Sequence, residues 1–438
     1  MTGIIVVFIV AILLGALGMP LAFALGISGV LGLVLVIGFD GAMGVVGATP
    51  FREAASLIFT TIPMFILMAE IANSSQITER LFKMAEVYMG KMRSGLGLAT
   101  ITAASIMGAL SGSSSASAAT FAATAAPAME KRGYSSRLAN GIVASSGTIA
   151  IMIPPSLAFI IYGVMTETSI GMLFLSGILP GILTAVLYAL TVIFLVKREK
   201  KKGDQTQEEA YEPPQATSAE KVKMLRSLGP ILLLVVIIMG GIYSGAMTAT
   251  EAGAVGAFSI LLITLLQRSL NWKSLNSALT STLRTTTMIM TMVVCAYFFA
   301  YFMVVSKIST SIISWAGDLT APPIVILMVI LLIYALLGCF LDQNAVLIIT
   351  IPLVFPLIME LGYDALWFGV LVTKTVEIGM LTPPFGMNCF VVAGTRNIRS
   401  EVVFRGVLPF IAAEIVCLAI LVMFPEISTF IPNLVSNK

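Results

Sequence analysis

The sequence predicts an all-α polytopic membrane protein, built as an inverted repeat with two re-entrant helical hairpins and two broken helices. Composition is the first observation behind this prediction. Of 438 residues, 58% are hydrophobic and only 11% are charged. A soluble protein carries about 25% charged residues, so a soluble globule is excluded.

A repeated pattern of proline, glycine and tyrosine is the second observation. Its two copies are separated by a constant offset of 229 residues: Pro127, Gly133, Tyr134 and Pro154-Pro155, then Pro356, Gly362, Tyr363 and Pro383-Pro384. Each double proline interrupts an apolar segment of span length and removes backbone hydrogen bonds that lipid cannot replace. Two broken helices at corresponding positions of two halves indicate the binding site of a secondary transporter.

The apolar segments divide the chain into two halves with the same order of elements, since a helix needs about 20 apolar residues to cross a membrane. We expect the first half, 1–196, to contain scaffold spans within 4–73 (4–18, 20–37 and 53–73), an amphipathic arm at 75–93, a hairpin at 96–130, a broken helix at 138–165 and a span at 170–196. The second half, 228–438, is expected to contain scaffold spans within 229–305 (229–246, 250–267 and 280–305), an arm at 306–318, a hairpin at 322–359, a broken helix at 366–395 and a span at 402–424. The polar segment 197–227 is interpreted as a flexible cytoplasmic linker.

The distribution of Lys and Arg predicts the orientation. With the linker inside, 21 basic residues fall in inner segments and three (Arg52, Lys307 and Lys438) in outer ones. This asymmetry follows the positive-inside rule. Five crossings per half then place both termini outside and invert the second half relative to the first.

The middle of each predicted hairpin is polar. The first contains Ser111, Gly112, Ser113, Ser114 and Ser115, and the same offset aligns residues 113–115 with Asp342, Gln343 and Asn344. Hydroxyl, carbonyl and carboxylate oxygens suit a hard monovalent cation, whereas the amide ends of interrupted helices suit an anion. Close helix packing is the alternative for a tract of small residues, and it accounts for the alanines better than for four serines in five positions.

Further candidates lie around the two breaks. Thr148 precedes the first break, and Thr382 and Asn388 flank the second. Lys374 and Glu377 are three residues apart on one helix face, so they either form an internal salt bridge or contact ion or substrate directly. The residues expected to contact substrate are Ser111, Gly112, Thr148, Pro155, Gln343, Lys374, Pro384 and Asn388.

These motifs resemble the large membrane subunit of the tripartite ATP-independent periplasmic (TRAP) transporters, the DctM-like subunit. The likeness is carried by SGSSSASAATFAATAAPAMEKRGYS, IPPSLAFIIYG and GCFLDQNA, PLIMELGYD and TPPFGMN, and it extends along almost the whole chain. The resemblance implies sodium-driven, elevator-type uptake of an organic anion, often a carboxylate or sialic acid, across the bacterial inner membrane. It also implies two partners, a periplasmic substrate-binding protein and a separate small four-helix (DctQ-like) membrane subunit. By the same resemblance, Na⁺ sites lie near each tip, at Ser113, Ser114, Ser115 and Pro154, and at Gly338, Asp342, Asn344, Thr382 and Pro383.

Other function classes fit less well. A stand-alone sodium/dicarboxylate-type symporter would share the internal design and differ by needing no binding protein. A channel would line a continuous path with polar residues, and an intramembrane protease would need paired aspartates. The chain has no histidine and its four cysteines lie in apolar segments, so neither a Cys/His transition-metal site nor an organic cofactor is expected. An enzyme is therefore not predicted.

Overall fold

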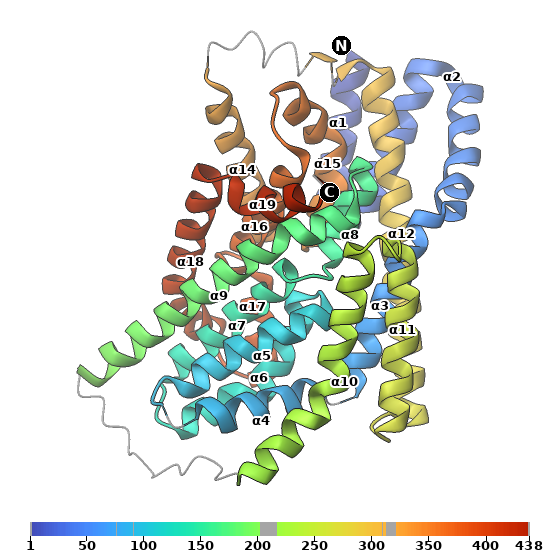
Figure 1. Cartoon of the computed structure of the whole chain (residues 1–438). Helices are drawn as coiled ribbons and strands as arrows, with labels where there is room; N and C mark the ends of the chain where they lie inside the picture. The colour runs from blue at the N-terminus through green and yellow to red at the C-terminus, as the bar shows by residue number, and fades with distance from the viewer. Residues whose placement is uncertain are drawn as a thin grey trace.

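The computed structural model describes residues 2–75, 77–90, 92–201, 217–308, 310–311 and 321–436, and within these ranges it contains helices and no strand (Figure 1). Eight of the described helices are long and apolar enough to cross a membrane. A ninth span results if the pair Ser136–Met152 and Leu157–Thr166, bent by 40°, is counted as one. The prediction of an all-α polytopic membrane protein is confirmed.

One set of helices, which we call the scaffold group, forms the right-hand side of Figure 1. It comprises α1 (Thr2–Ala16), α2 (Leu21–Ala55), the 3₁₀ turn η1 (Leu57–Thr60), α3 (Thr61–Ser74), α10 (Ser218–Tyr243), α11 (Ala249–Leu266) and α12 (Trp272–Val305). Helix α12 packs along α2 and α3, and α11 packs against α3. A side chain at Gly29 would lie 2.7 Å from the backbone of Phe299, so glycine allows α2 and α12 to approach closely.

The observed boundaries differ from the expected spans in several places. Helix α2 continues to Ala55 through a kink at Gly38, whose φ of 78° is accessible to glycine, so 20–37 is only its first part. Helix α12 begins before residue 280 because Asn271 caps it, accepting the Ser274 N–H at 2.8 Å. Helix α9 ends and helix α10 begins within the linker expected at 197–227, and residues 202–216 lie outside the described ranges. Most of the expected arm at 306–318 also lies outside them.

The remaining helices, which we call the transport group, contain both hairpins and both broken helices. From the first half they are α4 (Ile77–Met89), the hairpin α5 (Gly95–Ser111) and α6 (Ser114–Lys131), the broken helix α7 (Ser136–Met152) and α8 (Leu157–Thr166), and α9 (Ile170–Lys201). From the second they are the hairpin α14 (Pro323–Phe340) and α15 (Gln343–Glu360), the broken helix α16 (Ala365–Leu381) and α17 (Met387–Arg396), then α18 (Ser400–Met423) and α19 (Glu426–Ser436). A shift of 229 residues superimposes the bounds of α6 on α15 and of α7 on α16 without a gap.

The two broken helices interlock the repeats. The first part of each packs against its own hairpin, α7 on α5 and α6, and α16 on α14 and α15. The second parts cross over, because α8 packs against α15 and α17 packs against α6. In Figure 1 the α5–α6 hairpin lies in the lower half of the molecule and α14–α15 in the upper half.

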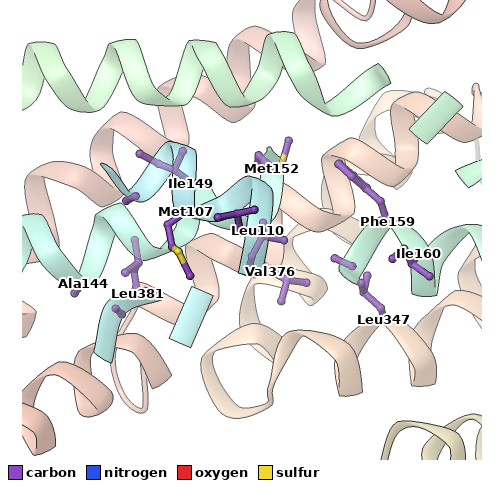
Figure 2. Close-up of a cluster of buried hydrophobic side chains, with 14 of the residues drawn as sticks. Met107, Leu110, Ala144, Ile149, Met152, Phe159, Ile160, Leu347, Val376 and Leu381 are labelled. Atoms are coloured by element: carbon purple, nitrogen blue, oxygen red, sulfur yellow. The ribbon is translucent and has the colours of Figure 1, made fainter. Parts of the chain in front are cut away.

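Side chains from both repeats form the core between the hairpins. Residues 138–152 of α7 and 367–381 of α16 are buried without exception. Phe159 and Ile160 of α8 lie close to Leu347 of α15, whereas Met107 and Leu110 of α5 lie among α7 side chains (Figure 2). A helix buried on all faces in a membrane protein is shielded from lipid, so its polar residues face other helices.

Candidate functional site

The first hairpin turns at Gly112. This residue ends α5 with φ at 54°, in the left-handed region that glycine adopts most easily. Ser113 then caps α6 by accepting the Ala116 N–H at 3.4 Å. A side chain at Gly112 would lie 3.1 Å from the carbonyl oxygen of Pro155, so the tip rests directly on the first helix break.

The second hairpin turns differently at the equivalent positions. Leu341 is extended, with φ at −121°, and Asp342 caps α15 by accepting the Asn344 N–H at 3.1 Å. A hydroxyl in one repeat and a carboxylate in the other therefore have the same capping role. Both tips also present a helix N-terminus, where unpaired N–H groups and the helix dipole favour negative charge.

A cavity of about 160 Å³ lies between the two tips and the scaffold group. Its wall is formed by α3 and Thr285 of α12 on one side, and by both tips, the first break and Met380 on the other. The predicted site residues that line it are Ser111, Gly112, Ser113, Ser114, Ser115, Pro155, Asp342, Gln343 and Asn344. The structure thus brings residues from two distant parts of the sequence to one site.

The cavity wall combines apolar and polar residues and, in the described part of the chain, has no basic side chain. Among the described residues that line it, Glu70 and Asp342 are acidic and none is Lys or Arg. Gln343 is only 4% exposed, and its Nε2 has no hydrogen-bond partner in the described part of the chain. An unpartnered buried amide is costly, so a ligand that accepts this hydrogen bond would be stabilised there.

Asn388 links the first tip to the second broken helix. It is fully buried on α17, and its amide nitrogen donates to Ser114 Oγ. Ser115 Oγ donates to Asn388 Oδ1 at 3.5 Å. Asn388 therefore lies directly behind the serines of the cavity wall, in contact with them rather than with the cavity.

Other predicted residues also lie outside the cavity wall. Thr382 ends α16 and donates to the Ile378 carbonyl at 2.6 Å. Gly338 allows α14 to approach α16, because a side chain there would lie 2.7 Å from the Val376 carbonyl oxygen. The predicted residues that do not line the cavity are Thr148, Pro154, Gly338, Lys374, Thr382, Pro383, Pro384 and Asn388.

Lys374 belongs to a second polar site, a buried network between four helices. Its Nζ lies 3.1 Å from Glu377 Oε2 and 2.5 Å from Glu414 Oε2, and it donates to Thr184 Oγ1 at 2.9 Å. All three ionisable side chains are fully buried. Of the two alternatives for Lys374 and Glu377, this structure shows the internal salt bridge.

Glu414 and Tyr188 complete this network, and the sequence reasoning missed both. Tyr188 donates its hydroxyl to Glu414 Oε1, and Thr148 donates to the same oxygen at 3.3 Å. Glu414 could have been found as a single carboxylate within the apolar span 402–424. Its partners could not, because they lie on other helices far away in the sequence.

Comparison with known proteins identifies the family. The family model described as "Tripartite ATP-independent periplasmic transporter, DctM component" matches residues 7–427 of this chain. The chain is 33% identical to the C4-dicarboxylate TRAP transporter large permease protein DctM of Pseudomonas aeruginosa, over 91% of this chain and 93% of that protein. It is 32% identical to the sialic acid TRAP transporter large permease protein SiaM of Vibrio cholerae, over 95% of each.

A solved structure shares the fold. The Alcanivorax borkumensis YdaH transporter, described as having an unusual topology, superimposes with a TM-score of 0.61 over 88% of this chain and 89% of that one. Its sequence identity of 13% supports likeness of fold alone. Both relatives named above are TRAP transporter large permease proteins and not enzymes. Since the family match covers nearly the whole chain, this protein belongs to the DctM family, the large membrane subunits of TRAP transporters.

Proposed function

We propose that this subunit couples the inward movement of Na⁺ to the import of an organic anion of the carboxylate or sialic-acid class, across the bacterial inner membrane. A periplasmic binding protein delivers the solute and a small four-helix subunit supports the scaffold group. Both termini lie on the periplasmic side, as the distribution of Lys and Arg favours. The solute classes are those named for the relatives.

The charge of the cavity wall is the observation that carries this proposal. A wall with Glu70 and Asp342 and no basic side chain among its described residues cannot neutralise an anion by itself. Bound cations supply the missing positive charge, and hydroxyl and carboxylate oxygens at both tips are suitable ligands for Na⁺. The N-termini of α6 and α15, with the unpartnered Gln343 amide, then offer donors for a carboxylate.

An elevator movement is supported by where the cavity lies. It is bounded by α3 and α12 on the scaffold side, whereas its tips and break belong to the transport group. Displacement of the transport group along the scaffold would carry the site as a unit, without taking its interlocked helices apart.

Reconstituted transport tests the proposal. The protein, its small subunit and its binding protein are placed in proteoliposomes, and uptake of labelled succinate and N-acetylneuraminate is measured with Na⁺ or with K⁺ outside. We expect replacement of Na⁺ to reduce uptake of the accepted solute at least about tenfold, equivalent to ~1.4 kcal/mol. Equal uptake in both salts would refute sodium coupling. Uptake without the binding protein would instead indicate a stand-alone sodium/dicarboxylate-type symporter.

A further inference from the structure

The buried network of Lys374, Glu377 and Glu414 joins the two repeats at equivalent positions. The 229-residue offset that relates the double prolines also relates Ser145 to Lys374, Thr148 to Glu377 and Tyr188 to Cys417. Thr148, Glu377 and Tyr188 all belong to the network, and Thr184 lies 3.5 Å from Cys417 Sγ. A cluster that contains both members of several equivalent pairs must lie on the approximate two-fold axis between the repeats.

The charged residues of this network all come from the second repeat. The second repeat contributes Lys374, Glu377 and Glu414, while the first contributes the hydroxyls of Thr148, Thr184 and Tyr188. Position 185, equivalent to Glu414, is alanine. Equivalent positions in the two halves therefore have different chemistry, such as Thr148 against Glu377.

Within the network, Glu414 contacts three other helices, more than any other member does. Its two oxygens receive Lys374 from α16, Tyr188 from α9 and Thr148 from α7. Glu377 is different, because its Lys374 contact is an i,i+3 pair within α16. Loss of the Glu414 carboxylate would thus remove the ion pair of α18 with α16 and its contacts with α9 and α7, whereas loss of the Glu377 carboxylate would remove a contact within α16.

Thr148 and Glu377 occupy the same place relative to the two breaks. Each precedes the first proline of its break by six residues, or about 9 Å along a helix. The first break supports the tip at Gly112, and α16 runs beside the hairpin whose tip carries Asp342. A rigid connection between α7 and α16 at this level therefore sets the position of one tip relative to the other.

We propose that Glu414 is a positioning residue that couples the two proposed Na⁺ sites, one at each hairpin tip. Its carboxylate contacts both broken helices, through Thr148 of α7 and Lys374 of α16, and also Tyr188 of α9. This inference rests on the proposed sodium coupling. Binding of Na⁺ at one tip orders its hairpin and break, and the network transmits that order to the other break. Coupling of this kind, in which one occupied site favours the other, is carried by an element whose equilibrium both sites bias.

Hydrogen exchange at the two tips tests the coupling. The full chain with its small subunit is titrated with Na⁺, and protection is followed separately in peptides covering 111–117 and 341–346. We expect Asp342→Asn to raise the Na⁺ midpoint at the distant first tip at least about fivefold, the lower end of common couplings. In a Glu414→Gln background the same change should raise it less than about twofold.

Glu377→Gln is the matched control, because it also removes one carboxylate from Lys374 and leaves the same formal charge. We expect Asp342→Asn to keep its fivefold effect in that background. Tyr188→Phe retains the ion pair and loses one bond to Glu414, so it provides a milder variant if Glu414→Gln does not fold. In the Tyr188→Phe background we expect Asp342→Asn to raise the Na⁺ midpoint at the first tip by between about twofold and fivefold.

The outcomes separate the two proposals. A distant effect of Asp342→Asn that keeps its full fivefold size in Glu414→Gln, or in Tyr188→Phe, would show that the network is only structural. An effect confined to the second tip in the unaltered background would also overturn the positioning role, with sodium binding intact. If Na⁺ protects neither tip of the wild-type protein, the proposed sodium coupling itself fails.

Discussion

The two hairpin tips have the same backbone plan and different chemistry. In the first repeat the turn is a left-handed Gly112 followed by the hydroxyl cap Ser113, and in the second it is an extended Leu341 followed by the carboxylate cap Asp342. Helices α17 and α8, which pack against the hairpin of the other repeat, also differ in polarity. Polar Asn388 supports the first tip, whereas its equivalent in the other repeat is the buried Phe159. The two halves thus share the positions of their helix breaks and differ in the side chains at and behind their tips.

Exchange of the charged cap is expected to have the largest effect. Asp342→Asn keeps the shape of the side chain and removes the charge of the second tip. A hydrogen bond or ligand contact to a charged group contributes about 1.5–3 kcal/mol, so the Na⁺ concentration for half-maximal uptake should rise tenfold to a hundredfold. Ser113→Ala is the matched variant at the first tip. It removes a neutral contact that contributes about 0.5–1.5 kcal/mol, so the Na⁺ concentration for half-maximal uptake should rise tenfold at most. Equal effects would mean that the tips are not chemically distinct.

Alteration of the two turns is expected to have the next largest effect. Gly112→Ala forces a side chain into a left-handed backbone at a cost of about 1–2 kcal/mol, and the added carbon would lie 3.1 Å from the Pro155 carbonyl oxygen. Uptake in proteoliposomes should fall about tenfold, and the melting temperature of the purified protein should fall with it. Leu341→Ala is the control, because its extended backbone accepts any residue. A larger loss for Leu341→Ala would contradict this account.

Removal of the polar support behind the first tip should have the smallest effect. Asn388→Ala leaves Ser114 without its donor, at a cost of about 1 kcal/mol for a neutral hydrogen bond. The Na⁺ midpoint should rise about fivefold at the first tip and by a smaller factor at residues 341–346, as measured by hydrogen exchange. A shift of equal size at both tips would show that Asn388 acts on the whole transport group and not on one half-site.

Much of the fold could be predicted from the sequence because prolines and glycines mark the repeat, and these residues determine the conformation of their own backbone. The breaks at Pro154-Pro155 and Pro383-Pro384 and the turns at Gly133 and Gly362 need no distant partner to be recognised. The kink at Gly38 was missed because an apolar stretch on either side of a glycine is compatible with one helix or two. Lys374 and Glu377 could be paired by their spacing, but the same spacing did not reveal Glu414.

The sequence by itself determined that this is a membrane protein, that it consists of two equivalent halves, and that each half contributes a polar tip and a broken helix. These properties depend on composition and on residues that control their own backbone. Tertiary structure alone decided which half each broken helix touches, that Asn388 meets Ser114, and that Glu414 receives Lys374, Tyr188 and Thr148. Such contacts depend on how buried helices cross in three dimensions, and apolar surfaces of similar composition allow many crossings.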